Sequence, residues 1–263
     1  MMAIEKQFRR IGARARIRTA EQASQSENVV IDIGRDEDGE FFDLALPRER
    51  RPRLTVLDAQ PKDRHLVLMS RNEDAKSKFL CGHDERHWFV AAVPERAGAS
   101  TVRTAMDALK PRVVHAAERA AKVKPKQRNR RRNAAFLRQG EWFFLPAGDV
   151  VVDPMLVRYK EPMARTGGKP HVVDELTRTG GELVYVSVQH PNGLTPRQHE
   201  KLLSRNPEMR HLNWVAQRRN PTVLVRGRVR HADHKTIRLD GWHQVVMNTE
   251  TQAHAMRHVA FID

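Results

Sequence analysis

Histidine and carboxylate residues near the C-terminus are the part of this 263-residue chain best suited to chemistry. The group consists of His231, Asp233, His234, His243, His254 and His258. Imidazole and carboxylate groups bind divalent metal ions, and a bound metal ion can activate water. The cofactor that this group favours is Mg²⁺, Mn²⁺ or Zn²⁺. The alternative interpretation is that these histidines are polar residues at the surface or at the edge of the core.

Residues 231–258 resemble the ββα-metal core of HNH endonucleases. The similarity consists of the pair Asp233-His234 on one strand, a hairpin, Asn248, and a histidine on a following helix. The resemblance implies that His234 is the general base that activates water and that Asn248 orients it. It also implies that Asp233 and either His254 or His258 hold the metal. With the neighbouring imidazoles, the expected ligands are Asp233, His231, His243 and His258, and the expected catalytic residues are His234, Asp233 and Asn248.

A second cluster, His83-Asp84-Glu85-Arg86-His87, lies at the tip of an expected hairpin. It could bind a metal by itself or join the C-terminal histidines in one site, and the sequence leaves both options open. Cys81 lies close by, which raises the option of a Cys-His nucleophile. A lone cysteine is more often buried and inert.

Alternating residues from Val223 to His231 predict a strand with arginines on one face. Arg226, Arg228 and Arg230 would follow one another about 7 Å apart, similar to successive phosphates on one nucleic-acid strand. Three like charges on one face repel each other unless a partner neutralises them. A solvated basic face is the competing interpretation.

A second basic region runs from Lys124 to Arg132 and precedes an aromatic strand that begins near Arg138. Arginine suits phosphate oxygens because its planar fork donates several hydrogen bonds at once. The residues that we expect to contact nucleic acid are Arg226, Arg228, Arg230, Arg128, Arg130, Arg131, Arg132 and Arg138.

The charge balance also favours a polyanionic partner. The chain has 47 Lys and Arg residues against 32 Asp and Glu residues, a formal net charge of +15. Such an excess favours nucleic acid, either DNA or RNA, although an acidic protein would also satisfy it. The one cysteine, Cys81, provides no intrachain disulfide and excludes cysteine-rich zinc folds.

Other function classes find little support in the sequence. No apolar run is long enough to span a bilayer, so no membrane partner is expected. Together with the lone cysteine, this indicates a cytoplasmic protein, with association to the nucleoid as one form of that location. The motifs of phosphate-binding loops, dinucleotide folds, HExxH metalloproteases and GxSxG hydrolases are absent from the sequence.

The pattern of apolar runs and turns predicts an α+β fold that is strand-rich, mostly antiparallel and poor in helices. We expect a flexible basic arm over residues 1–28, an α+β region over 29–123, a basic linker over 124–132, and a strand-rich α+β region over 133–263. The clearest helix covers 100–121 and should break at Pro111. Thr195 should cap another helix. Strands are expected over 221–230, 235–239 and 242–247, with a turn at Asp240-Gly241.

Three hypotheses therefore remain. The first is a nucleic-acid-binding protein without catalysis, which uses the basic arm, the linker and the arginine strand face. The second is a metal-dependent endonuclease of the HNH type, which uses the C-terminal histidines. The third is a structural or assembly protein whose charge docks an acidic partner. The sequence decides neither between DNA and RNA nor the oligomeric state.

Overall fold

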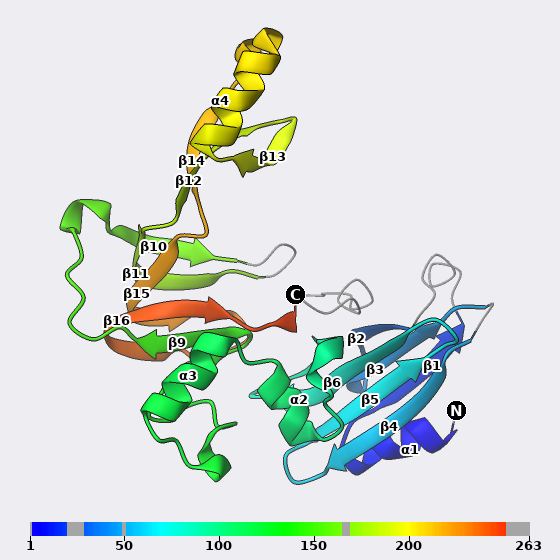
Figure 1. Cartoon of the computed structure of the whole chain (residues 1–263). Coiled ribbons are helices and arrows are strands. Elements are labelled where there is room, and N and C mark those ends of the chain that lie inside the picture. Colours follow the sequence, from blue (N-terminus) through cyan, green and yellow to red (C-terminus); the bar gives the residue numbers. More distant parts are fainter. Residues whose placement is uncertain (1, 20–28, 49–50, 165–168, 251–263) are drawn as a thin grey trace.

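A computed structural model describes residues 2–19, 29–48, 51–164 and 169–250 (Figure 1). The chain is strand-rich and mostly antiparallel with few helices, which confirms the predicted α+β class. Its strands form four sheets, and β1 with β3 is a parallel pair. No helix in these ranges is long and apolar enough to cross a membrane.

The N-terminal unit consists of two sheets packed over one core. The first has the order β1 (Ala15–Thr19), β3 (Gly39–Leu46), β2 (Val30–Asp36). The second has the order β4 (Arg53–Gln60), β5 (His65–Arg71), β6 (Lys76–Asp84), β7 (His87–Val93). Phe42 and Leu44 of the first sheet share a fully buried cluster with Leu68 and Phe79 of the second.

The expected flexible arm over residues 1–28 is wrong for its described part. Residues Met2–Arg10 form helix α1, and β1 follows it into the first sheet. Phe8 is fully buried and Ile11 nearly so, and both belong to the core between the two sheets. This amphipathic pattern is hard to recognise in the sequence, because many arginines occupy the solvent side of the same elements. Residues 20–28 lie outside the described residues.

The predicted break at Pro111 divides the long helix into α2 (Val102–Ala108) and α3 (Arg112–Ala120). Helix α2 begins at a Thr101 capping box and buries Val102 and Ala105 against the second sheet. Helix α3 instead buries Val114 with the C-terminal strand β9 (Trp142–Pro146). The boundary between the N-terminal and C-terminal cores therefore falls between α2 and α3 in the sequence, before the linker expected at 124–132.

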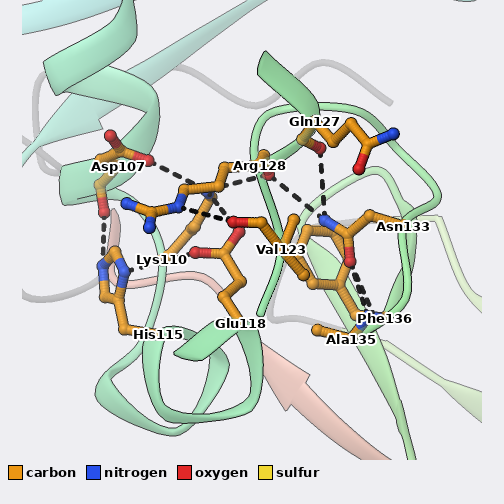
Figure 2. Close-up of polar contacts among 10 residues, drawn as sticks. All are labelled: Asp107, Lys110, His115, Glu118, Val123, Gln127, Arg128, Asn133, Ala135 and Phe136. Carbon is orange, nitrogen blue, oxygen red and sulfur yellow. Dashed lines mark hydrogen bonds and ion pairs between the residues drawn. The ribbon is translucent and has the colours of Figure 1, made fainter. Parts of the chain in front are cut away.

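The basic segment 124–132 is fastened to the helices by a buried lysine (Figure 2). Lys110 Nζ donates to Asp107 at 2.9 Å, to Glu118 at 2.8 Å and to the Arg128 carbonyl at 3.0 Å. Lys110 and Glu118 are 6% and 3% exposed. Because Asn133 also donates to the Gln127 carbonyl, at 3.4 Å, the middle of the segment is held at two successive carbonyls. It is an ordered, exposed loop of the C-terminal unit.

The C-terminal unit is built on a six-stranded sheet. Its order is β10 (Arg158–Met163), β11 (His171–Thr179), β15 (Thr222–Arg230), β16 (Ile237–Met247), β9, β8 (Leu137–Gln139). Leu176, Val225 and Phe144 form its core on one face, and α3 covers Phe143 and Leu145 on the other.

The predicted turn at Asp240-Gly241 is wrong, because residues 237–247 form the single strand β16. The pairing of β16 with β15 extends from Val229↔Ile237 to Leu224↔Gln244. This long ladder outweighs the local turn preference. Gly241 instead adopts φ +80° within the strand, where the register with β15 is irregular. The chain reverses at residues 231–236.

An arm is inserted between the neighbouring strands β11 and β15. It contains β12 (Glu182–Ser187), β13 (His190–Leu194), helix α4 (Pro196–Arg205) and β14 (Val215–Arg219). The three strands form a small sheet of their own, and the arm projects beyond the six-stranded sheet (Figure 1). The predicted Thr195 cap is present as a capping box with Gln198.

Candidate metal centre

Three histidines from different parts of the C-terminal sheet come together at one end of β11. His171 is the first residue of β11, His231 directly follows β15, and His234 lies in the turn before β16. Val172 pairs with Arg230, so the next step of this register places His171 opposite His231. One nitrogen of each ring lies within 4.8 Å of those of the other two. The His171 and His231 rings stack with centroids 4.2 Å apart.

The nitrogens of this cluster are poorly satisfied within the protein. His171 is 1% exposed, and neither of its ring nitrogens has a hydrogen-bond partner among the described residues. The same holds for His234 Nδ1, and Trp142 Nε1 beside His171 is likewise unpaired. Buried polar groups are normally hydrogen bonded, and each orphan costs about 1–3 kcal/mol. The cluster therefore fits a ligand that bonds to nitrogen lone pairs.

Burial keeps His171 and His234 uncharged. Burial, followed by the charges of His231 and His234, lowers the pKa of His171 to about 3. Burial, followed by the charge of His231, also lowers the pKa of His234 to about 4. Neutral imidazole is the form that ligates metals, so both rings are ready to bind at neutral pH.

Gly140 provides the open space that the cluster faces. It adopts φ +56° in the tight turn between β8 and β9. A Cβ atom on this residue would lie 3.0 Å from His234 Nε2 and 3.7 Å from His171 Nε2. Both Nε2 atoms therefore point toward one small volume that any larger residue would fill.

Three imidazoles with one open position suit Zn²⁺ or a similar transition metal, whereas Mg²⁺ prefers oxygen ligands. Tetrahedral zinc with bonds of about 2.0–2.1 Å requires the ligand nitrogens to approach more closely than 4.8 Å. His231 Nδ1 accepts a hydrogen bond from the Asp233 amide at 3.1 Å. This bond must break if His231 binds a metal through Nε2, because Nδ1 then carries the proton. Metal binding thus involves a small movement of the 231–234 turn.

Carboxylates and cations surround the three histidines. Glu85, in the β6–β7 turn, has Oε2 4.0 Å from His234 Nδ1 and accepts from the Lys235 amide at 2.5 Å. Arg131 pairs with both Asp84 and Glu85. Metal-bound histidines commonly direct their second nitrogen to a carboxylate, and Glu85 is placed for that role.

Asp233 is held on the other side by Lys169 at 2.9 Å. Burial raises the pKa of this carboxyl, but the hydrogen bond and charge of Lys169 outweigh burial and lower the pKa overall.

A cleft of about 430 Å³ opens beside the cluster, between the N-terminal and C-terminal units. His231, Asp233 and His234 line it on one side, and Arg128 and Arg130 of the basic segment line it as well. The N-terminal unit contributes Glu40, His87 and Trp88 among others. The cleft therefore brings two cations of the basic segment and two of the three histidines into one lining.

The structure groups some of the sequence-predicted site residues and separates others. Asp233, His234 and Asn248 all line the cleft, and His231 belongs to the three-histidine cluster. His243 does not, because its Nδ1 lies 3.0 Å from the Gly241 carbonyl on the far part of β16. His254 and His258 lie outside the described residues, so the helix implied by the HNH resemblance is not described.

The second histidine cluster is divided in the same way. Asp84 and Glu85 approach the C-terminal histidines through Arg131 and His234, whereas His87 pairs with Glu40 at 2.6 Å and His83 packs against Trp88. Cys81 is fully buried in the N-terminal core, and burial raises the pKa of its thiol. The Cys-His nucleophile thus has no structural support.

The predicted arginine strand face is paired within the protein, with two carboxylates facing three arginines. Arg226 pairs with Glu175 at 2.5 Å, and Arg228 and Arg230 both pair with Asp174, at 3.1 and 2.8 Å. The backbone amide and the side chain of Arg228 contribute to lowering the pKa of Asp174 to about 2. These acidic partners come from β11, which is far from β15 in the sequence.

The basic segment and the residues just before it, in contrast, carry positive charge that is mostly unpaired. Residues 119–132 contain eight basic and no acidic residues. They are Arg119, Lys122, Lys124, Lys126, Arg128, Arg130, Arg131 and Arg132. Arg131 turns inward to Asp84 and Glu85, and Arg138 inside the cleft lies 3.9 Å from Asp84. The other seven are exposed and form no ion pair with the described part of the chain.

The residue that sequence reasoning missed is His171, the most deeply buried member of the cluster. In the sequence, the residues before His171 indicate only a glycine-rich turn. The pairing of β11 with β15 is not evident there, because a long insertion separates the two strands. Comparisons add no family: no family model, no curated protein and no solved structure matches this chain.

Proposed function

We propose that this protein is a metal-dependent hydrolase that cleaves phosphodiester bonds in nucleic acid. The observation that carries the proposal is the cluster of His171, His231 and His234, in which both His171 nitrogens and His234 Nδ1 are unpaired and the His171 and His234 rings border the space beside Gly140. A Zn²⁺ ion in such a three-histidine site supplies a coordinated water whose pKa falls to about 7.

The substrate class follows from what shares the cleft. Arg128 and Arg130 line the same cleft as His231 and His234, two of the three proposed ligands, on a segment without acidic residues. These guanidiniums would bind the phosphate groups on either side of the scissile bond. The net charge of +15 favours the same partner.

The other residues of the cleft have defined roles in this proposal. Asp233, kept ionised by Lys169, accepts the proton of the attacking water. The water oxygen forms a bond to phosphorus, the phosphorus–oxygen ester bond breaks, and the proton passes to the leaving oxygen. Glu85, whose Oε2 lies 4.0 Å from His234 Nδ1, would orient His234 after a small approach of the two groups. His234 is thus a metal ligand here, in place of the general base implied by the HNH resemblance.

The test is a cleavage assay with labelled single- and double-stranded DNA and RNA in Zn²⁺, Mn²⁺, Mg²⁺ or EDTA. Cleavage should require a transition metal and disappear in His171→Gln, whereas His211→Gln, on the exposed arm, should cleave normally. Binding of Co²⁺, followed by its visible spectrum, should be lost in the same variant. Cleavage that persists undiminished in His171→Gln would contradict the proposal.

A second candidate is nucleic-acid binding without hydrolysis. It is favoured by the exposed, unpaired cations of residues 119–132, which need no metal to bind phosphate. Tight, salt-sensitive binding with no cleavage under any metal would favour it. Preference for an acidic protein over nucleic acid would instead support an assembly role. Either nucleic-acid function implies a location where the polymer is present, which for a bacterial-type cytoplasm includes the nucleoid.

A further inference from the structure

The arm of residues 182–219 is a separate attachment to the body of the protein. Thr179 and Thr222 pair across its base, so the hairpin β11–β15 would be complete without it. Its strands and helix pack on one another and project beyond the six-stranded sheet (Figure 1). The fold of the body therefore gives no structural reason for the arm.

Stacked rings hold the arm in one shape. His199 of α4 stacks on Tyr185 of β12 with centroids 4.3 Å apart, and it also contacts Trp214 edge-on at 4.5 Å. Trp214 in turn stacks on His190 and donates its Nε1 hydrogen to the Met209 carbonyl at 2.9 Å. These contacts fix the face of α4 that points toward the small sheet, and so they also fix the face that points away.

The outward face of α4 carries a stripe of positive charge. Arg197, Lys201 and Arg205 are four residues apart, so they lie on one side of the helix with a rise of about 6 Å between neighbours. All three are exposed, and none forms an ion pair within the described part of the chain. We call these three residues the α4 stripe.

The α4 stripe differs from the arginines of the sheets. Arg14 pairs with Asp36, Arg18 with Asp43, and Arg178 with Glu161, as do Arg226, Arg228 and Arg230 with the acidic residues of β11. Arginines on the sheet surfaces are thus commonly paired with a carboxylate. The three cations of the stripe form no such ion pair in the described part of the chain, although Glu200 lies on the same helix, so their charge is available to a polyanion.

We propose that the α4 stripe is a second nucleic-acid contact, which binds the phosphate backbone at a distance from the cleft. The spacing along α4 is comparable to that of successive phosphates on one strand. The arm leaves the body at the Thr179–Thr222 end of β11 and β15, whereas the histidines lie at the His171 end, so the stripe would hold a part of the polymer away from the cleft. This inference shares the nucleic-acid partner of the proposed function and is independent of hydrolysis.

The experiment compares two matched triple variants of the full chain. One neutralises the stripe by Arg197→Gln, Lys201→Gln and Arg205→Gln. The control removes the same charge from exposed residues of the N-terminal unit by Lys62→Gln, Arg71→Gln and Arg103→Gln. Glutamine keeps the helix propensity of α4 nearly unchanged, and thermal unfolding verifies that both variants fold.

The measurement is fluorescence anisotropy with labelled DNA and RNA of about 30 nucleotides, in EDTA, over a range of salt concentrations. Each lost phosphate contact removes about 0.7–0.9 from the slope of log K against log salt. The stripe variant should therefore show a slope shallower by about 2 and at least tenfold weaker binding at low salt, while the control keeps the parental slope.

Each result supports or overturns the role of the α4 stripe. Equal slopes and affinities in the two variants would overturn the role of the stripe but leave the cleft proposal intact. A parent that binds no nucleic acid would overturn both. If polyglutamate of equal charge competes as well as nucleic acid, the stripe would take an acidic polypeptide, and the inference would be wrong. Loss of cleavage alone would leave this inference unchanged, because the binding assay contains no metal.

Discussion

Acidification of the metal-free protein should reveal the buried histidine cluster. Burial lowers the pKa of His171 to about 3, against about 6.5 in the unfolded chain. Between these values the unfolded chain binds a proton that the folded chain does not bind. The free energy of unfolding therefore falls as the pH falls through this window, and the stability is fully present above about pH 6.5.

The size of the effect follows from the same numbers. At pH 5 the unfolded imidazole is almost fully protonated while the folded one is neutral, which costs up to about 2 kcal/mol relative to pH 8. His234, with a pKa of about 4, contributes a similar amount. Because His171 is only 1% exposed, solvent screening reduces its share little.

Urea unfolding followed by tryptophan fluorescence in EDTA measures this loss. His171→Phe keeps a planar apolar ring against Trp142 and His231 but cannot take up a proton. The parent should lose about 2 kcal/mol more than this variant between pH 8 and pH 5. Equal losses in both proteins would show that His171 is protonated in the folded state. The reasoning about burial would then be refuted.

Three further changes test other parts of the structure. Gly140→Ala should weaken Zn²⁺ binding by about tenfold or more, because its Cβ would approach His234 Nε2. Calorimetric titration measures the affinity. The control is Gly98→Ala, because Gly98 has a similar φ of +61° and open space around it. Lys110→Met should destabilise the fold by about 3–5 kcal/mol in urea because it leaves Glu118 buried without its cation, and adding Glu118→Gln should restore most of the loss. Deletion of residues 182–221 should leave Gly180-Gly181 as a two-residue turn, with the melting temperature and Co²⁺ binding of the parent; a collapsed melting transition would show that the arm is part of the core.

The elements that the sequence predicted are those with local signals. The break at Pro111 follows from proline chemistry, and the cap at Thr195 from its spacing to Gln198. The antiparallel, strand-rich class follows from short apolar runs joined by turn residues. In each of these cases the physical cause lies within a few residues of its effect.

The missed features depend on contacts between distant parts of the chain. His171 faces His231 only because β11 pairs with β15 across the whole inserted arm. Asp174 and Glu175 form ion pairs with the three arginines of the strand face through the same pairing. The turn expected at Asp240-Gly241 gives way to a strand because the long β15 ladder provides more hydrogen bonds than a local turn does.

Pairing of β11 with β15 thus builds the candidate metal centre and also determines which arginines remain available for a partner. Asp174 and Glu175 pair with the arginines of β15, whereas the cations of residues 119–132 other than Arg131, and those of the α4 stripe, are exposed and form no ion pair in the described part of the chain. Lys110 and Glu118 hold the first of these in place, and the ring stack around His199 holds the second. Both surfaces are therefore preorganised, so little conformational entropy is lost when a polyanion binds them. Under the proposed function, a polymer bound at the first surface would pass His231 and His234, because Arg128 and Arg130 line the same cleft.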